Sequence, residues 1–175
     1  MAKKKKKQKQ GGARCLDLLR LGSMLGFFFG LFLGAIYIGF LQKGLVYPLF
    51  LYWGLAQAVM GAGLICVYRL SQKPKHAFGG MLLVASAFFS ANRALELFPP
   101  LGLIEAATQA LGVVSFSLLL YELGRDRPGS GLELAGGLIF LGVIFQILSA
   151  PLMEAVGVFL LALGFLLASG RLARL

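Results

Sequence analysis

Polar side chains inside long apolar segments are the residues of this chain best placed to do chemistry. Some of them flank the pair Pro99-Pro100, and the others lie in neighbouring apolar segments. The set is Gln57, Asn92, Arg93, Glu96, Glu105, Gln109, Gln146 and Glu154. Polar and ionised groups are costly in hydrocarbon, so they usually face the interior of a helix bundle or a water-filled cavity. These residues therefore predict a ligand-binding pocket.

The helical rise places several of these groups at matching depths. At 1.5 Å per residue, Arg93 and Glu105 lie roughly 7–10 Å below the turn that joins their helices. Gln57 and Gln109 lie deeper and level with each other, about 13 Å from the prolines that precede them. The whole set then falls in the half of the membrane remote from the N-terminus, and we expect the pocket to face outward.

The charges of this set suggest the kind of ligand. One positive and three negative groups favour a cationic or neutral polar solute over an anion. In an alternative interpretation, Arg93 pairs with Glu96 or Glu105 as a structural pin. Glu154 then simply lies in the headgroup region near a helix N-terminus.

The sequence has no recognisable set of catalytic residues. It contains no H-E-x-x-H, G-x-S-x-G, P-loop or CxxC motif. Serines of the apolar segments include Ser86, Ser90, Ser115 and Ser117. A serine nucleophile needs a base in reach, and the one histidine, His76, falls in a predicted, solvated loop. We therefore expect a protein that is not an enzyme and uses no cofactor and no metal.

The two cysteines, Cys15 and Cys66, have neither metal-ligand nor redox-motif spacing. Both fall near helix ends that we expect to face the cytoplasm. Thiols stay reduced in that compartment. A structural disulfide is therefore not expected.

Composition identifies the elements that must position these groups. Of 175 residues, 58% are hydrophobic and only 14% are charged. In a typical soluble domain about a quarter of the residues are charged. Apolar runs of about 18 residues or more are typical of membrane spans. The sequence predicts an all-α membrane protein of about six transmembrane helices, at 21–41, 45–69, 79–98, 101–122, 132–149 and 151–169. The last two are short, so a re-entrant hairpin is an alternative for them.

These helices form one membrane domain, with short segments at both ends. The predicted division is a basic lead-in at 1–20, a six-helix domain at 21–171 and a short segment at 172–175. The run at 21–41 is too long for the core of a cleavable signal peptide and reads as a retained first span. Of the 17 Lys and Arg residues, all but Lys43 and Arg93 fall on one side. The positive-inside rule then predicts a protein of the cell (inner) membrane with both termini in the cytoplasm.

Six lysines precede the first apolar run. They are Lys3, Lys4, Lys5, Lys6, Lys7 and Lys9. A block of like charge is normally disordered and solvated, and this one is also expected to bind anionic lipid headgroups. Nucleic-acid binding is not expected because the basic residues form no folded face.

Glycines of the first predicted helix recur at every fourth residue, at Gly22, Gly26, Gly30 and Gly34. This spacing lets a second helix approach closely. The partner is either a helix of the same chain or another membrane protein. Short glycine-containing motifs also open the three odd-numbered helices 57 residues apart, which favours three parallel helical hairpins.

The number of helices, the chain length, the glycines of the first helix and the outward pocket resemble the substrate-capturing subunits of energy-coupling-factor vitamin transporters. This resemblance covers architecture alone and carries no ligand residue over. It implies a docking face on the first helix and a solute pocket at the outer side. Our principal hypothesis is a non-catalytic subunit or scaffold that packs beside larger membrane proteins through the glycine face. The alternative is a solute-binding or transport component that uses the polar set.

Overall fold

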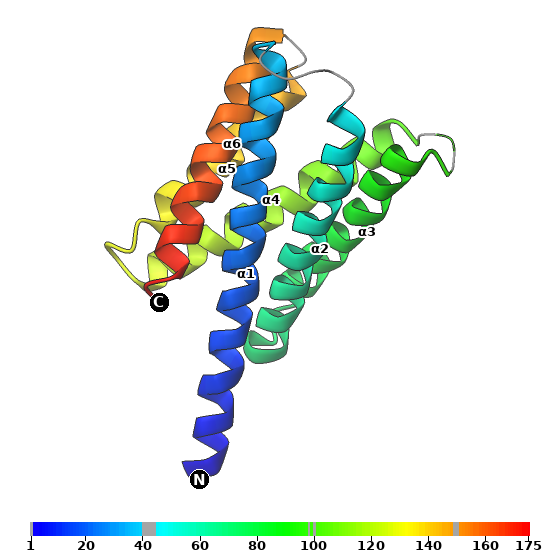
Figure 1. Cartoon of the computed structure of the whole chain (residues 1–175). Coiled ribbons are helices and arrows are strands. Elements are labelled where there is room, and N and C mark those ends of the chain that lie inside the picture. The colour runs from blue at the N-terminus through cyan, green and yellow to red at the C-terminus, as the bar shows by residue number, and fades with distance from the viewer. Residues whose placement is uncertain (1, 40–44, 98, 100, 149–150) are drawn as a thin grey trace.

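The computed structural model is a bundle of six α-helices (Figure 1). They are α1 (Ala2–Tyr37), α2 (Val46–Ser71), α3 (Pro74–Leu95), α4 (Leu103–Asp126), α5 (Leu132–Ile147) and α6 (Pro151–Leu172). The structure describes the whole chain except residues 1, 40–44, 98, 100 and 149–150, and it leaves out the side chains of 2–10, 37, 46 and 151. No strand occurs among the described residues. The prediction of an all-α fold with six helices is confirmed.

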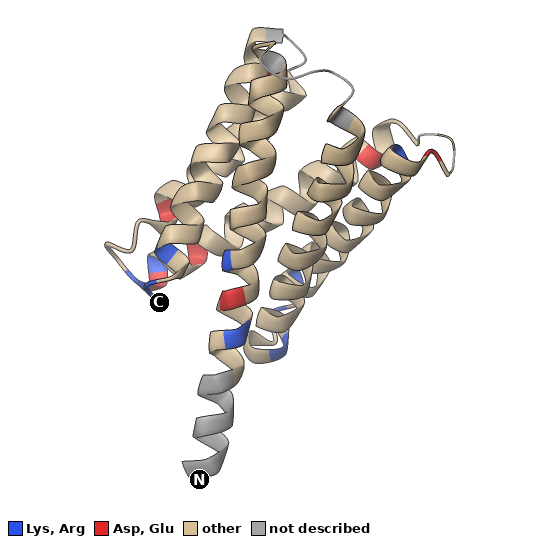
Figure 2. Ribbon diagram, in the orientation of Figure 1, with Lys and Arg blue, Asp and Glu red and all other residues tan. Residues whose placement is uncertain are grey.

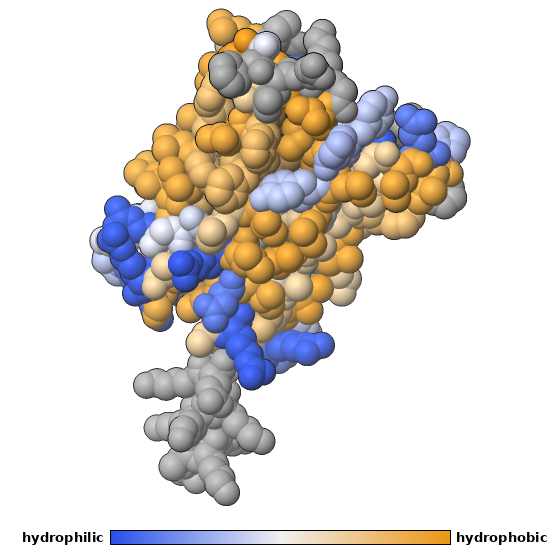
Figure 3. Space-filling view, in the orientation of Figure 1, coloured by the Kyte–Doolittle hydropathy of each residue, from blue (hydrophilic) through white to orange (hydrophobic). Residues whose placement is uncertain are grey.

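Five of the helices are long and apolar enough to cross a membrane, which makes this a multi-pass membrane protein. Figure 3 shows a predominantly apolar exterior over most of the height of the bundle. The remaining helix, α5, has 16 residues and is about 24 Å long, against about 30 Å for the hydrocarbon core. A re-entrant course of α6 gains no support, because α6 has 22 residues and is long and apolar enough to cross a membrane.

Two helices begin earlier than the sequence predicts. The backbone of α1 is helical from Ala2 rather than from residue 21, since Lys, Gln, Leu and Arg are all good helix formers. Contact of the lysines at 3–9 with lipid stays a prediction, because their side chains lie outside the described part. Helix α3 begins at Pro74 rather than at 79, because proline is well tolerated in the first turn.

The early start of α3 corrects the prediction for His76, which was expected in a solvated loop. His76 lies in the first turn of α3 and is 4% exposed. Its Nε2 atom is 3.7 Å from Oε2 of Glu122 on α4. The side chain therefore packs between α3 and α4, a contact that was not expected from the sequence.

The helices form a ring in which each packs on the next and α6 packs on α1. Neighbouring helices in this ring run in opposite directions (Figure 1). This arrangement is compatible with the three parallel helical hairpins predicted from the sequence. Except for Arg93, the described Lys and Arg side chains lie toward the end of the bundle that carries both termini (Figure 2). We call this the basic end. From there α1 and α2 diverge toward the opposite end (Figure 1).

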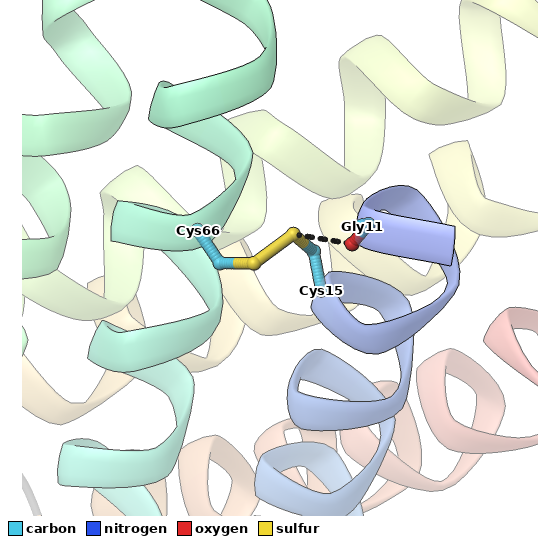
Figure 4. The surroundings of a disulfide bond; sticks show 3 residues. All are labelled: Gly11, Cys15 and Cys66. Carbon is cyan, nitrogen blue, oxygen red and sulfur yellow. Dashed lines mark hydrogen bonds between the residues drawn. A yellow bond between two sulfur atoms is a disulfide. The ribbon is translucent and has the colours of Figure 1, made fainter. Parts of the chain in front are cut away.

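The basic end is closed by close contacts between α1 and α2. A Cβ atom added to Gly63 would lie 2.6 Å from Cδ2 of Leu19, and one added to Gly22 would lie 3.0 Å from the backbone nitrogen of Met60. At the same end, Cys15 of α1 is disulfide-bonded to Cys66 of α2, with their Cα atoms 5.4 Å apart (Figure 4). The expectation that no disulfide forms is wrong for this structure. The expectation rested on compartment alone, whereas the antiparallel packing of the two helices brings the cysteines to one depth.

The disulfide predicts the outcome of thiol labelling. Protein purified without reductant and then denatured should take up no maleimide, because both sulfurs are bonded, and should take up two labels after reduction. A Cys15→Ser variant serves as the control, since it frees Cys66 and should take up one label without reductant. Two labels on unreduced wild-type protein, counted by intact mass, would contradict the pairing.

Candidate functional site

A cavity of about 570 Å³ lies where the helices diverge, and all six helices contribute to its wall. Its lining is Phe29, Leu33 and Ile36 of α1, Leu49, Phe50 and Trp53 of α2, Arg93 of α3, Gln109 of α4, Gln146 of α5 and Leu161 of α6. Seven of these ten side chains are apolar or aromatic. The cavity is therefore a mainly apolar space with three polar groups in its wall.

A second cavity of about 480 Å³ shares four wall residues with the first, namely Trp53, Gln109, Gln146 and Leu161. The rest of its lining comes from α4 and α5. These residues are Leu103, Ala106, Ala107, Ala110, Val113, Val143 and Ile147. Because the two cavities meet at common side chains, we treat them as one space and call it the central cleft.

Aromatic rings pack around the inner end of the central cleft. The Trp53 indole stacks on the Phe29 ring with centroids 4.5 Å apart, and the Phe165 ring meets it edge-on at 6.0 Å. Trp53 is only 2% exposed. These rings join α1, α2 and α6 at the depth where the close contacts of the basic end give way to the cleft.

Gln57 lies behind this aromatic cluster rather than in the cleft. It is fully buried, and with its amide oriented to satisfy its neighbours it accepts a hydrogen bond from Trp53 Nε1 at 3.0 Å. In the same orientation it donates to the Ser86 carbonyl at 3.1 Å and to Ser90 Oγ at 2.9 Å. Gln57 therefore fixes the indole and ties α2 to α3, which makes it a positioning residue.

Arg93 and Glu105 form the ion pair of the cleft wall. Arg93 Nε donates to Glu105 Oε2 at 2.9 Å. Glu105 is 3% exposed and also accepts from the backbone N–H of Leu101 at 3.1 Å. The Arg93 guanidinium carbon lies 5.6 Å from the centroid of the Phe50 ring, within cation–π range. Of the two pairings that the sequence allowed, the structure contains the one with Glu105.

The other predicted site residues lie outside the cleft wall. Asn92 is buried within α3, and Glu96 is exposed at the C-terminal cap of that helix with a φ of 52°. Glu154 is partly buried in the first turn of α6. Among the described residues, Arg93 is the one charged side chain that lines the cleft. The expectation of a cationic or neutral polar ligand rested on a count of three carboxylates, and these carboxylates do not line the cleft.

The glycines of α1 face other helices of the same chain. A Cβ atom on Gly26 would lie 3.0 Å from the ring of Phe165, and one on Gly30 would lie 2.8 Å from Cβ of Ala162, both on α6. Gly22 faces Met60 of α2, and Gly34 lies closest to Phe159 of α6. The same-chain alternative accounts for these contacts. We therefore place no partner on this face.

Sequence reasoning missed the apolar part of the site because it selected residues by polarity. Trp53, Phe50 and Leu161 line the cleft, yet aromatic and aliphatic residues are unremarkable in a membrane span. One signal was available. Trp53 precedes Gln57 by four residues, so the two share a helix face and can interact.

No protein-family model, curated protein or solved structure matches this chain. The chemistry of the site is therefore the guide to function. Its wall combines apolar surface, two carboxamides and a guanidinium whose charge is balanced by Glu105.

Proposed function

We propose that this protein binds a small amphipathic molecule in the central cleft, as a solute-binding or transport component rather than an enzyme. One observation carries the proposal: all six helices contribute to a single cavity of about 570 Å³. Ligand pockets usually measure about 300–1,000 Å³ and combine an apolar lining with a few placed polar groups. The central cleft has both properties.

The wall residues suggest the ligand's chemistry. The carboxamides of Gln109 and Gln146 each offer two N–H donors and one carbonyl acceptor. The guanidinium of Arg93 has five N–H donors, and its Nε–H is taken by Glu105. Since the ion pair is neutral as a unit, we propose an uncharged ligand with a polar group near these residues and an apolar body against Trp53.

The subunit hypothesis receives less support, because the glycine face of α1 is occupied by α6 and α2 of the same chain. Any energy-coupling partner of the kind that the resemblance implies would have to dock on another surface. We also propose that the basic end faces the cytoplasm, in keeping with the positive-inside rule. Disulfides are rare in that compartment. The Cys15–Cys66 pair is therefore at odds with this orientation, and the orientation is tested separately: an impermeant amine reagent added outside intact cells should not label Lys73 or Lys75, whereas labelling of either lysine would show that the basic end faces outward.

Replacing both wall glutamines should abolish most of the ligand binding. Leucine is similar to glutamine in size, so the Gln109→Leu/Gln146→Leu variant should fold while losing two hydrogen bonds to the ligand. At about 1 kcal/mol for each bond, affinity should fall about 30-fold. The measurement is the molar amount of small molecule that co-purifies from native membranes into nanodiscs, determined by mass spectrometry.

Thr108→Val is the matched control, because Thr108 lies next to Gln109 on α4 but outside the cleft lining, and valine has the same shape without the hydroxyl. It should retain the compound at the wild-type level. The proposal fails if nothing co-purifies with wild-type protein above the level of empty nanodiscs. It also fails if the double variant carries as much compound as the wild type.

A further inference from the structure

Some side chains of α4 and α5 both line the central cleft and are exposed. Leu103 of α4 is 83% exposed and Ile147 of α5 is 63% exposed, and both line the cleft. Between them, Ala106 and Ala107 are also exposed. Side chains that are both cleft-lining and exposed mark a place where the cleft meets the surroundings of the protein. We call this place the α4–α5 window.

The window lies at a depth where lipid chains surround the protein. Its exposed α4 residues extend from Leu103 to Ala107, a rise of about 6 Å at the end of the span remote from the basic end, within a hydrocarbon core of about 30 Å. All of them belong to an apolar helix of membrane-spanning length. The window therefore faces acyl chains near that end of the span.

Small side chains and a short helix keep the window open. Ala106, Ala107 and Ala110 contribute only methyl groups to its α4 rim. The opposite rim ends with α5, which stops at Ile147 after 16 residues. Apart from Gln109 and Gln146, the described residues that line this side of the cleft are apolar. A molecule that passes the window would meet apolar surface first and the two carboxamides at the end of its path.

We propose that the ligand reaches the central cleft from within the bilayer, through the α4–α5 window, and is a membrane-dissolved lipid-like molecule with an uncharged polar head. This inference rests on the proposed function, since it names the ligand class of the same cleft. A charged solute would face the high cost of crossing hydrocarbon to reach the window. A neutral amphipath already has its apolar part in the right medium.

The single tryptophan of the chain allows a direct test. Trp53 lies where the two cavities of the cleft meet, so its fluorescence reports on whatever enters. The full chain is placed in vesicles of phosphatidylcholine whose acyl chains carry bromine, a quencher of indole fluorescence. We expect strong quenching in wild-type protein. Ala107→Phe, which fills the window at an exposed position, should remove most of it.

Leu111→Phe is the matched control, because Leu111 is 53% exposed one turn further along α4 and lies outside the cleft lining. It should be quenched like the wild type. Equal quenching in Ala107→Phe and wild type would overturn the inference, because acyl chains would then act from the outer surface of the bundle.

A second quencher separates failure of this inference from failure of the proposed function. If aqueous iodide quenches Trp53 and brominated chains do not, the cleft exists but opens to water, and the lateral route is wrong. If neither quencher reaches Trp53, the cleft is closed, and the proposed function fails together with the route.

Discussion

Gly136→Ala should destabilise the protein, whereas Gly137→Ala should not, although the two glycines are adjacent in α5. A Cβ atom on Gly136 would lie 2.7 Å from the Ser117 carbonyl oxygen and 3.2 Å from the Tyr121 nitrogen, both backbone atoms of α4. A Cβ atom on Gly137 would have nothing within 4 Å. Backbone cannot move aside as a flexible side chain can, so we expect a loss of about 1–3 kcal/mol at 136.

The Gly137→Ala variant is the matched control, since it makes the same chemical change in the same helix. It should leave stability unchanged or raise it by up to about 1 kcal/mol, because alanine favours the helix. The measurement is the midpoint of thermal unfolding of purified protein in detergent. Similar midpoints for the two variants would show that α4 and α5 do not approach each other closely at the basic end.

The sequence predicted the six helices because bilayer thickness sets the length of each apolar run. The predicted bounds were wrong at the N-terminal ends of α1 and α3, which begin earlier than predicted. Charged residues before Leu21 suggested a later start for α1, yet lysine and arginine favour helix, and α1 begins at Ala2. The pairing of Cys15 with Cys66 was also out of reach, since it depends on which faces of α1 and α2 meet.

The depth of the site was easier to predict than its walls. Depth follows from the rise per residue, and the matching depths of Arg93 and Glu105 are reflected in their ion pair. Gln57 and Gln109 were also predicted to lie level, but Gln57 is buried against Trp53 while Gln109 lines the cleft. Which side of a helix faces a cavity depends on how the helices cross, and no single span encodes that.

Substitutions at the Arg93–Glu105 ion pair can separate a structural role of the pair from a role in ligand binding. Arg93→Met should destabilise the protein by roughly 1–3 kcal/mol, because the buried Glu105 is left without its cation while Arg93 itself is 41% exposed and its charge is partly screened. Glu105 is 3% exposed, and in this variant it would keep the hydrogen bond from the Leu101 N–H but lose its cation. Thermal unfolding in detergent measures the loss. Arg69→Met, which removes an exposed arginine at the basic end, should have little effect.

The double variant Arg93→Met/Glu105→Met decides between the two roles. Replacing both charges by apolar groups of similar size is often neutral or stabilising, so the unfolding midpoint should return close to the wild-type value. If Arg93 donates to the ligand, the restored protein will still carry less co-purified compound than the wild type. A double variant that recovers both stability and ligand would show that the pair only pins α3 to α4. Ligand recognition would then depend on the two glutamines and the aromatic wall.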